Sequence, residues 1–217
     1  MATYKEAGVD VDAGTEAVAR IKKHVRETFN ANVLTDLGGF GGCFRFPKDK
    51  YDDPVLISSA DGVGTKLKLA FLTNRHDTIG QCLVNHCVDD ILAVGARPLF
   101  FLDYFAAGKL DQTVLSSVVE GLTKACVENS CVLIGGETAE MPGFYKEGEY
   151  DISGTIIGVV EKEHMMPSKK VNAGDILYAL PSTGLHTNGY SLARNVLLKE
   201  FRIDDYVESL GKTLGEE

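Results

Sequence analysis

The sequence Asp61-Gly62-Val63-Gly64-Thr65-Lys66 directly follows a short apolar run at residues 55–60. That run is bounded by Pro54 and predicts a β-strand. The strand therefore ends in a carboxylate, two glycines, a hydroxyl and a lysine. Carboxylate oxygens are ligands that Mg²⁺ prefers, glycine lets the backbone approach a ligand closely, and lysine supplies a positive charge for phosphate. This combination predicts a site for a metal and a polyphosphate.

The same six residues also fit a plain turn between two strands, because Asp-Gly is a common turn pair. They are not a Walker A loop, since the order Gly-x-x-x-x-Gly-Lys-Ser/Thr is absent. The choice between a turn and a ligand site therefore depends on the rest of the chain.

Composition is that of an ordinary soluble globular protein, with 217 residues, 44% hydrophobic and 24% charged. No apolar run approaches the ~20 residues of a membrane helix, and residues 1–12 do not resemble a signal peptide. The net charge of −9 argues against a nucleic-acid partner. The five cysteines form no Cys-x-x-Cys pair, which indicates reduced thiols in a cytoplasmic protein.

Alternating helices and strands predict α/β layers. We expect a first helix capped by Thr15, and then a glycine-rich loop at residues 38–42 that is either a lid or a linker. A long helix is expected from a cap at Thr78 to a stop at Gly95. The remaining expected elements are a strand at residues 99–105, a helix capped by Asp111, strands at residues 131–134, 150–161 and 176–180, and a helix at residues 190–201.

Polar residues recur at the ends of these strands and in the long helix. Residues 135–143 and 184–189 are further strand-end loops with glycines and polar side chains. Asp89 and Asp90 lie within the long helix, near apolar neighbours. A carboxylate there is costly unless it is paired or metal-bound, so Asp90 is a candidate site residue. The alternative is an exposed acid on the polar side of the helix.

A polar segment at residues 162–175 predicts a domain boundary. We therefore expect an N-terminal domain at residues 1–166. Residues 167–217 would be a linker and the start of a C-terminal α/β domain. That second part is too short to bury a core of its own, which predicts that the chain is a fragment.

In these motifs the chain resembles the phosphoribosylformylglycinamidine cyclo-ligase family, also called aminoimidazole ribonucleotide synthetases. Residues 61–66 alone indicate only the wider superfamily, which includes formylglycinamidine synthetase, thiamine-phosphate kinase, selenophosphate synthetase and a hydrogenase maturation factor. Their combination with residues 135–143 selects the cyclo-ligases. The matching motifs lie at residues 4–10, 38–42, 61–66, 98–104, 135–143 and 184–194.

The resemblance implies an α/β fold in which residues 1–166 form the N-terminal ATP-binding and dimerisation domain, with a mixed sheet and helices on one face. Two such domains would form a shared β-barrel in a homodimer. The implied reaction uses ATP and Mg²⁺ to phosphorylate the formyl-amide oxygen of formylglycinamidine ribonucleotide, after which an internal amine attacks and phosphate leaves. The product is aminoimidazole ribonucleotide, made in de novo purine biosynthesis. The alternatives are another ATP-dependent kinase or synthetase of the superfamily, or a non-catalytic nucleotide-binding dimer module.

Several residue roles follow from the resemblance. Asp61 and Asp90 would hold Mg²⁺, and Asp89, which stands where the family usually has Asn, would add a carboxylate. Lys22 and Lys66 would contact phosphate. The other implied site residues are His186 as general acid and base, Asn188 and Gly41 for substrate, and Gly62, Gly64, Thr65, Gly135, Gly136, Glu137 and Thr138 for ATP and its phosphates.

Overall fold

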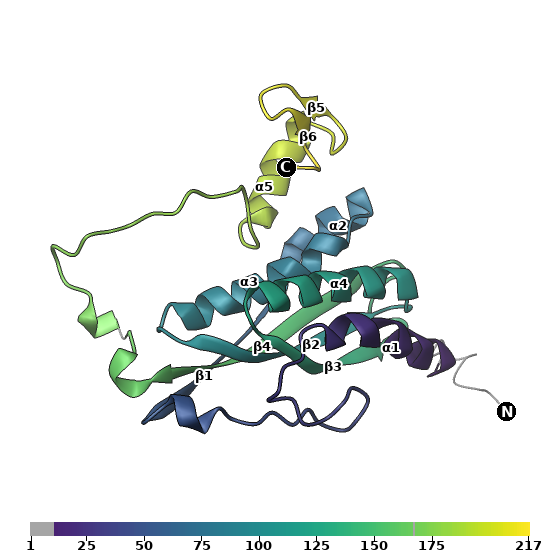
Figure 1. The fold of residues 1–217 in the computed structure, drawn as a ribbon. Coiled ribbons are helices and arrows are strands. Elements are labelled where there is room, and N and C mark those ends of the chain that lie inside the picture. The colour runs from purple at the N-terminus through teal and green to yellow at the C-terminus, as the bar shows by residue number, and fades with distance from the viewer. Residues whose placement is uncertain (1–10, 167) are drawn as a thin grey trace.

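The computed structural model describes residues 11–166 and 168–217, so the motif at residues 4–10 lies outside the described residues. A four-stranded mixed sheet forms its centre, in the strand order β1-β4-β2-β3 (Figure 1). Strand β4 is antiparallel to both β1 and β2, whereas β2 and β3 are parallel. The predicted mixed sheet is therefore confirmed. The strands are β1 (Pro54–Gly62), β2 (Arg97–Ala107), β3 (Val132–Glu140) and β4 (Tyr150–Glu161).

Three helices cover one face of this sheet, as predicted (Figure 1). They are α1 (Val11–Arg26), α3 (Asp77–Leu92) and α4 (Gln112–Glu128). Successive side chains of a strand point to opposite faces, so every second residue of β4 is buried beneath the helices. The core lies between the sheet and the helices, and its largest buried side chains include Phe101, Phe105, Ile152, Ile156, Leu83 and Leu122.

Two glycines bring α3 and α4 into backbone contact. A Cβ atom on Gly80 of α3 would lie 2.2 Å from the carbonyl oxygen of Val118, and one on Gly121 of α4 would lie 2.3 Å from that of Asp77. No side chain fits at either position. The close packing of these helices positions the face of α3 that meets β1.

Of the three helix caps predicted from the sequence, one is confirmed and two are wrong. Asp111 caps α4, because its carboxylate accepts hydrogen bonds from the amides of Thr113 and Val114. The expected caps Thr15 and Thr78 are wrong: α1 is already helical at Val11, and α3 begins at Asp77 after His76. A hydroxyl residue in the first turns of a helix resembles a cap in sequence, so the start of a helix is easily placed too late along the chain.

The predicted end of α3 is close to the observed one. Gly95 has a φ of +88°, the left-handed region that glycine adopts freely. The amide of Gly95 donates to Leu92 O at 2.8 Å, and the amide of Ala96 donates to Ile91 O at 3.0 Å. This pair of bonds is a Schellman motif, which ends the helix.

Strands β1 and β3 are longer than predicted. Asp61 and Gly62 were expected in a turn, yet they pair with Gly154 and Ser153 of β4. Residues 135–140 were expected in a loop, yet they pair with β2. Pairing with a neighbouring strand keeps these glycines extended, and the local sequence does not show which strand will be the neighbour. After β1 the chain forms the short turn η2 (Gly64–Lys66) and helix α2 (Leu67–Thr73).

The C-terminal part runs away from the sheet and returns as α5 (Tyr190–Glu200) beside α2 (Figure 1). Helix α5 confirms the expected helix at residues 190–201. The expected strand at residues 176–180 is wrong, because none of the described strands pairs with it. Four of its side chains are between 77% and 94% exposed.

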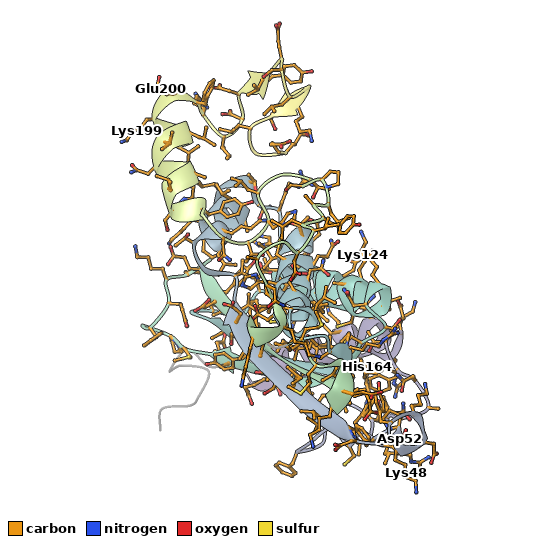
Figure 2. All side chains as sticks on the ribbon, turned by 90° about the vertical axis from the view of Figure 1, so that its left-hand side faces the viewer. Lys48, Asp52, Lys124, His164, Lys199 and Glu200 are labelled. Atoms are coloured by element: carbon orange, nitrogen blue, oxygen red, sulfur yellow. The ribbon has the colours of Figure 1, made fainter. Side chains whose placement is uncertain are left out.

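The remaining short elements lie at the periphery. They are η1 (Lys48–Lys50), η3 (Lys162–His164), η4 (Ser168–Lys170), and the hairpin of β5 (Tyr206–Val207) and β6 (Lys212–Thr213). Figure 2 shows Lys199 and Glu200 at the end of the molecule opposite to Lys48 and Asp52. None of the described helices is long and apolar enough to span a lipid bilayer.

Candidate functional site

One face of α3 carries polar residues that meet the end of β1. His86 and Asp90 lie one turn apart on this face, because residues four apart in a helix are neighbours. Ser59 and Asp61 share one face of β1, since they are two residues apart. The Nε2 atom of His86 lies 2.5 Å from Asp61 Oδ2, and Ser59 Oγ donates to Asp90 Oδ2 at 2.5 Å. The structure therefore brings Asp61 and Asp90 into one cluster.

Lys66 extends this cluster by one helical turn. Its Nζ atom lies 3.0 Å from the sulfur of Cys82, which precedes His86 by four residues on α3. The ammonium also lies 5.0 Å from the centre of the Tyr190 ring. Burial acts to lower the pKa of Lys66, but the Cys82 thiol and the Tyr190 hydroxyl outweigh it, so the pKa is raised. Lys66 therefore keeps its positive charge, beside the turn of α3 that precedes His86.

The loop that contains His186 reaches the same place from the far end of the chain. Lys66 Nζ donates to the backbone carbonyl of His186 at 2.6 Å, and the hydroxyls of Thr65 and Ser191 lie 2.9 Å apart. The His186 imidazole is exposed and hydrogen-bonds to the Thr183 hydroxyl at 3.2 Å. Tertiary contacts thus join residues 64–66 to the predicted acid–base loop. Asn188 is exposed in this loop. Gly62 is the last residue of β1, and Gly64 is the first residue of η2.

The carboxylates of this cluster fit a divalent cation that also contacts a phosphate. The side chain of Asp61 is 43% exposed, and Asp90 is exposed as well. Within residues 11–166 and 168–217, no group of three or more His, Cys, Asp or Glu side chains is arranged to hold a metal. Mg²⁺ commonly binds through one or two carboxylates, with the other ligands coming from substrate phosphates and water.

Asp89 does not share the face of α3 that carries Asp90. Consecutive helical residues diverge by about 100° around the axis, and Asp89 is exposed. Its backbone carbonyl accepts the amide of Ala93 within the helix end. His86, not Asp89, is therefore the α3 residue that contacts Asp61.

A second group of predicted residues lines a cavity of about 550 Å³ between α1, the loop at residues 36–42 and strands β2 and β3. Five of the predicted ligand-binding residues line this cavity. They are Gly41, Gly135, Gly136, Glu137 and Thr138.

This cavity is separate from the cluster around Asp61. Asp61, Gly154, Asp103 and Gly136 form one row across β1, β4, β2 and β3. Three strand spacings of about 4.8 Å place the backbones of Asp61 and Gly136 about 14 Å apart. The structure therefore divides the predicted site residues into two regions at the same level of the sheet.

Lys22 belongs to the cavity region. Its Nζ atom donates to the carbonyl of Leu37 at 3.2 Å and lies 3.1 Å from Asp36 Oδ2. Hydrogen bonds from Arg26 and then Lys22 hold the pKa of Asp36 below its usual range. Asp36 and Leu37 line the cavity, so Lys22 lies at its rim and away from Asp61 and Asp90.

The carboxyl group of Asp103 also faces this cavity. Its Oδ1 atom would lie 2.3 Å from a Cβ on Gly136, so the glycine leaves room for the carboxyl group. Leu133 and Val119 are among the apolar residues around the cavity. Burial raises the pKa of Asp103 to about 7.

Comparison with known proteins identifies the family. The family model described as AIR synthase related protein, N-terminal domain, matches residues 41–160, more than half of the chain. The chain belongs to this family.

Curated relatives of this chain are similar along almost all of it. A protein of Brevibacillus brevis is 55% identical over 216 residues, which are 99% of this chain and 62% of the relative. A protein of Acetivibrio thermocellus is 54% identical over 218 residues, which are 100% of this chain and 64% of the relative. Both are named phosphoribosylformylglycinamidine cyclo-ligase. The chain thus spans less than two thirds of their length.

Solved structures share the fold at low sequence identity. A hydrogenase maturation protein HypE in complex with ATP has a TM-score of 0.56 and 19% identity, covering 78% of this chain and 46% of that one. A thiamine-monophosphate kinase from Stenotrophomonas maltophilia has a TM-score of 0.54 and 20% identity, covering 69% of this chain and 43% of that one. These likenesses confirm the mixed α/β fold of the chain.

Sequence reasoning missed two residues of the site, His86 and Asp103. A signal existed for each: His86 precedes Asp90 by four residues, and Asp103 is the single acid in an otherwise apolar strand. Neither signal indicates the partner, because the contact with Asp61 or with the cavity depends on tertiary packing.

Asp103→Asn is expected to stabilise the protein at pH 8 and to make its stability depend less on pH. The folded state keeps the Asp103 proton up to a pKa of about 7, whereas the ordinary value is 3.8. Between these values the folded state binds more protons, so the free energy of unfolding falls as pH rises. At about 1.4 kcal/mol per pKa unit the loss reaches about 4 kcal/mol, reduced by any water in the cavity.

Urea unfolding at pH 5 and pH 8 checks this expectation, with the exposed Asp151→Asn as the control. The pH-dependent gain should be confined to Asp103→Asn. Equal pH slopes for the wild type and Asp103→Asn would contradict a raised pKa of Asp103.

Proposed function

We propose that the protein is an ATP-dependent cyclo-ligase that converts formylglycinamidine ribonucleotide into aminoimidazole ribonucleotide, with release of ADP and phosphate, in de novo purine biosynthesis. The observation that carries the proposal is the meeting of Asp61, Asp90, Lys66 and the His186 loop at the end of β1. These groups supply a cation site, a phosphate contact and an acid–base residue in one place. The names of relatives that are 54–55% identical support the same activity.

ATP and Mg²⁺ are the proposed cofactors. The structural neighbour HypE was solved in complex with ATP and shares this fold. Asp61 and Asp90 would hold Mg²⁺, and Lys66 would contact the phosphates. Bound Mg²⁺ would offset the charge of the transferring phosphoryl group. Gly62 ends β1, and Gly64 and Thr65 lie in the turn η2 that precedes Lys66.

The reactants would bind in two regions, the cluster around Asp61 and the cavity beside β3. The cavity lined by residues 135–138 would receive part of the nucleotide or substrate, with Lys22 and Gly41 at the loop that closes it. A closed loop would exclude water, which otherwise hydrolyses a phosphorylated intermediate. His186 would transfer the proton during ring closure, and Asn188 would orient the substrate.

We also propose that the protein is a cytoplasmic homodimer. The sheet face opposite the helices exposes Leu56, which is 60% exposed, and the ring of Tyr104. Pairing this face with a second copy would cover these apolar side chains and protect the edge of β1. The five free cysteines, four of them buried or half-buried, favour a reducing compartment.

Product analysis tests the proposed reaction. ADP and aminoimidazole ribonucleotide should form in equal amounts, and only when formylglycinamidine ribonucleotide is present. The assay should use this chain alone and this chain joined to the part of the Brevibacillus brevis relative outside the match. A stable phosphorylated product without imidazole would instead indicate a kinase. Binding of ATP without turnover in either form would indicate a nucleotide-binding module.

A further inference from the structure

Four side chains form a crossed arrangement where β1 meets α3. Strand β1 contributes Ser59 and Asp61, and α3 contributes His86 and Asp90. Each element therefore supplies one carboxylate and one side chain that hydrogen-bonds to a carboxylate. The contacts run crosswise, because Ser59 binds Asp90 while His86 binds Asp61. Each carboxylate is thus held by a group from the opposite element.

The contact between His86 and Asp61 lies partly inside the molecule. The His86 side chain is 17% exposed, whereas that of Asp61 is 43% exposed. The imidazole therefore lies behind the carboxylate, on the side away from solvent. An ionised carboxylate only accepts hydrogen bonds, so Nε2 of His86 carries the proton in this contact.

Both oxygens of Asp61 have a donor. Oδ2 accepts from His86 Nε2, and Oδ1 accepts from the backbone amide of Gly62 at 2.7 Å. Two donors at different oxygens fix the rotation of the carboxylate plane. Each oxygen retains a second lone pair, because a carboxylate has about four acceptor sites. The held carboxylate can therefore still bind a cation from the solvent side.

We propose that His86 is a positioning residue that orients the Asp61 carboxylate for a divalent cation, as Ser59 does for Asp90. This inference rests on the proposed role of Asp61 and Asp90 in holding the cation. An unheld carboxylate loses rotational freedom on binding, whereas a held one has lost it already. Groups that orient metal ligands typically change metal affinity 10–100-fold when they are removed.

The test is a titration of the chain with Mn²⁺ alone, followed by the electron paramagnetic resonance signal of free Mn²⁺. His86→Met removes the donor at similar size, and we expect Mn²⁺ to bind about 10-fold or more weakly. His86→Gln keeps an N–H donor, and it should restore affinity to within about threefold of the wild type. His164→Met is the matched control, since the His164 side chain is exposed and contacts Glu163.

The outcomes separate this inference from the proposed function. Asp61→Asn should bind Mn²⁺ more weakly than every His86 variant, and unchanged binding would overturn the cation site itself. If Asp61→Asn loses binding while His86→Met matches the wild type or binds more tightly, the positioning role is wrong. Equal loss in His86→Gln and His86→Met, at unchanged thermal stability, would also overturn it, because the donor would not be what matters.

Discussion

Asp61→Asn is expected to weaken Mg²⁺-dependent ATP binding on the order of 100-fold, which corresponds to about 2.7 kcal/mol. The amide removes a negative charge and one of two oxygens from a site where a cation would share ligands with phosphate. The fold should remain intact, because Asp61 is half-exposed and its backbone still pairs with Gly154 of β4.

Isothermal titration calorimetry with ATP, in Mg²⁺ and in EDTA, checks this prediction. Asp53→Asn is a suitable control, because Asp53 is exposed just before β1 and pairs with Lys162. For Asp61→Asn, the ATP affinities measured in Mg²⁺ and in EDTA should become similar. For Asp53→Asn, ATP should still bind more tightly in Mg²⁺ than in EDTA. Unchanged ATP affinity in Asp61→Asn would remove this residue from the metal site.

Gly121→Ala is expected to lower the free energy of unfolding by about 2 kcal/mol or more. Alanine has the higher helix propensity by about 1 kcal/mol, so propensity alone predicts the opposite sign. The new Cβ would lie 2.3 Å from the carbonyl oxygen of Asp77, however, and a backbone atom yields only if α3 moves. Overpacking of this kind typically costs about 1–3 kcal/mol.

Gly14→Ala in α1 provides the matched control for helix propensity. No atom lies within 4 Å of its added Cβ, so this change should stabilise the chain by up to about 1 kcal/mol. Urea unfolding of the two variants should therefore give shifts of opposite sign. Stabilisation by both would show that α3 and α4 are less closely packed at Gly121 than the structure has them.

Elements whose sequence signal is local could be predicted correctly from the sequence alone. The strand expected at residues 150–161 is β4 with the same bounds, because alternating apolar residues identify a half-buried strand. Asp111 caps α4 as expected, since the bond joins residues only two and three apart. The strand expected at residues 176–180 failed for the converse reason. Its pattern is that of a strand, but the described part of the chain supplies no partner for its backbone.

The candidate site divides in the same way. The sequence identified Asp61, Asp90 and Lys66 by their chemistry and their place at the end of a strand. Only the tertiary structure showed that His86 contacts Asp61, while Asp89 lies on another face of α3. It also placed residues 135–138 across the sheet from Asp61. The chemistry of a side chain follows directly from the sequence. The partner of that side chain depends on the rotation of the helices and the order of the strands, which are set when the core packs.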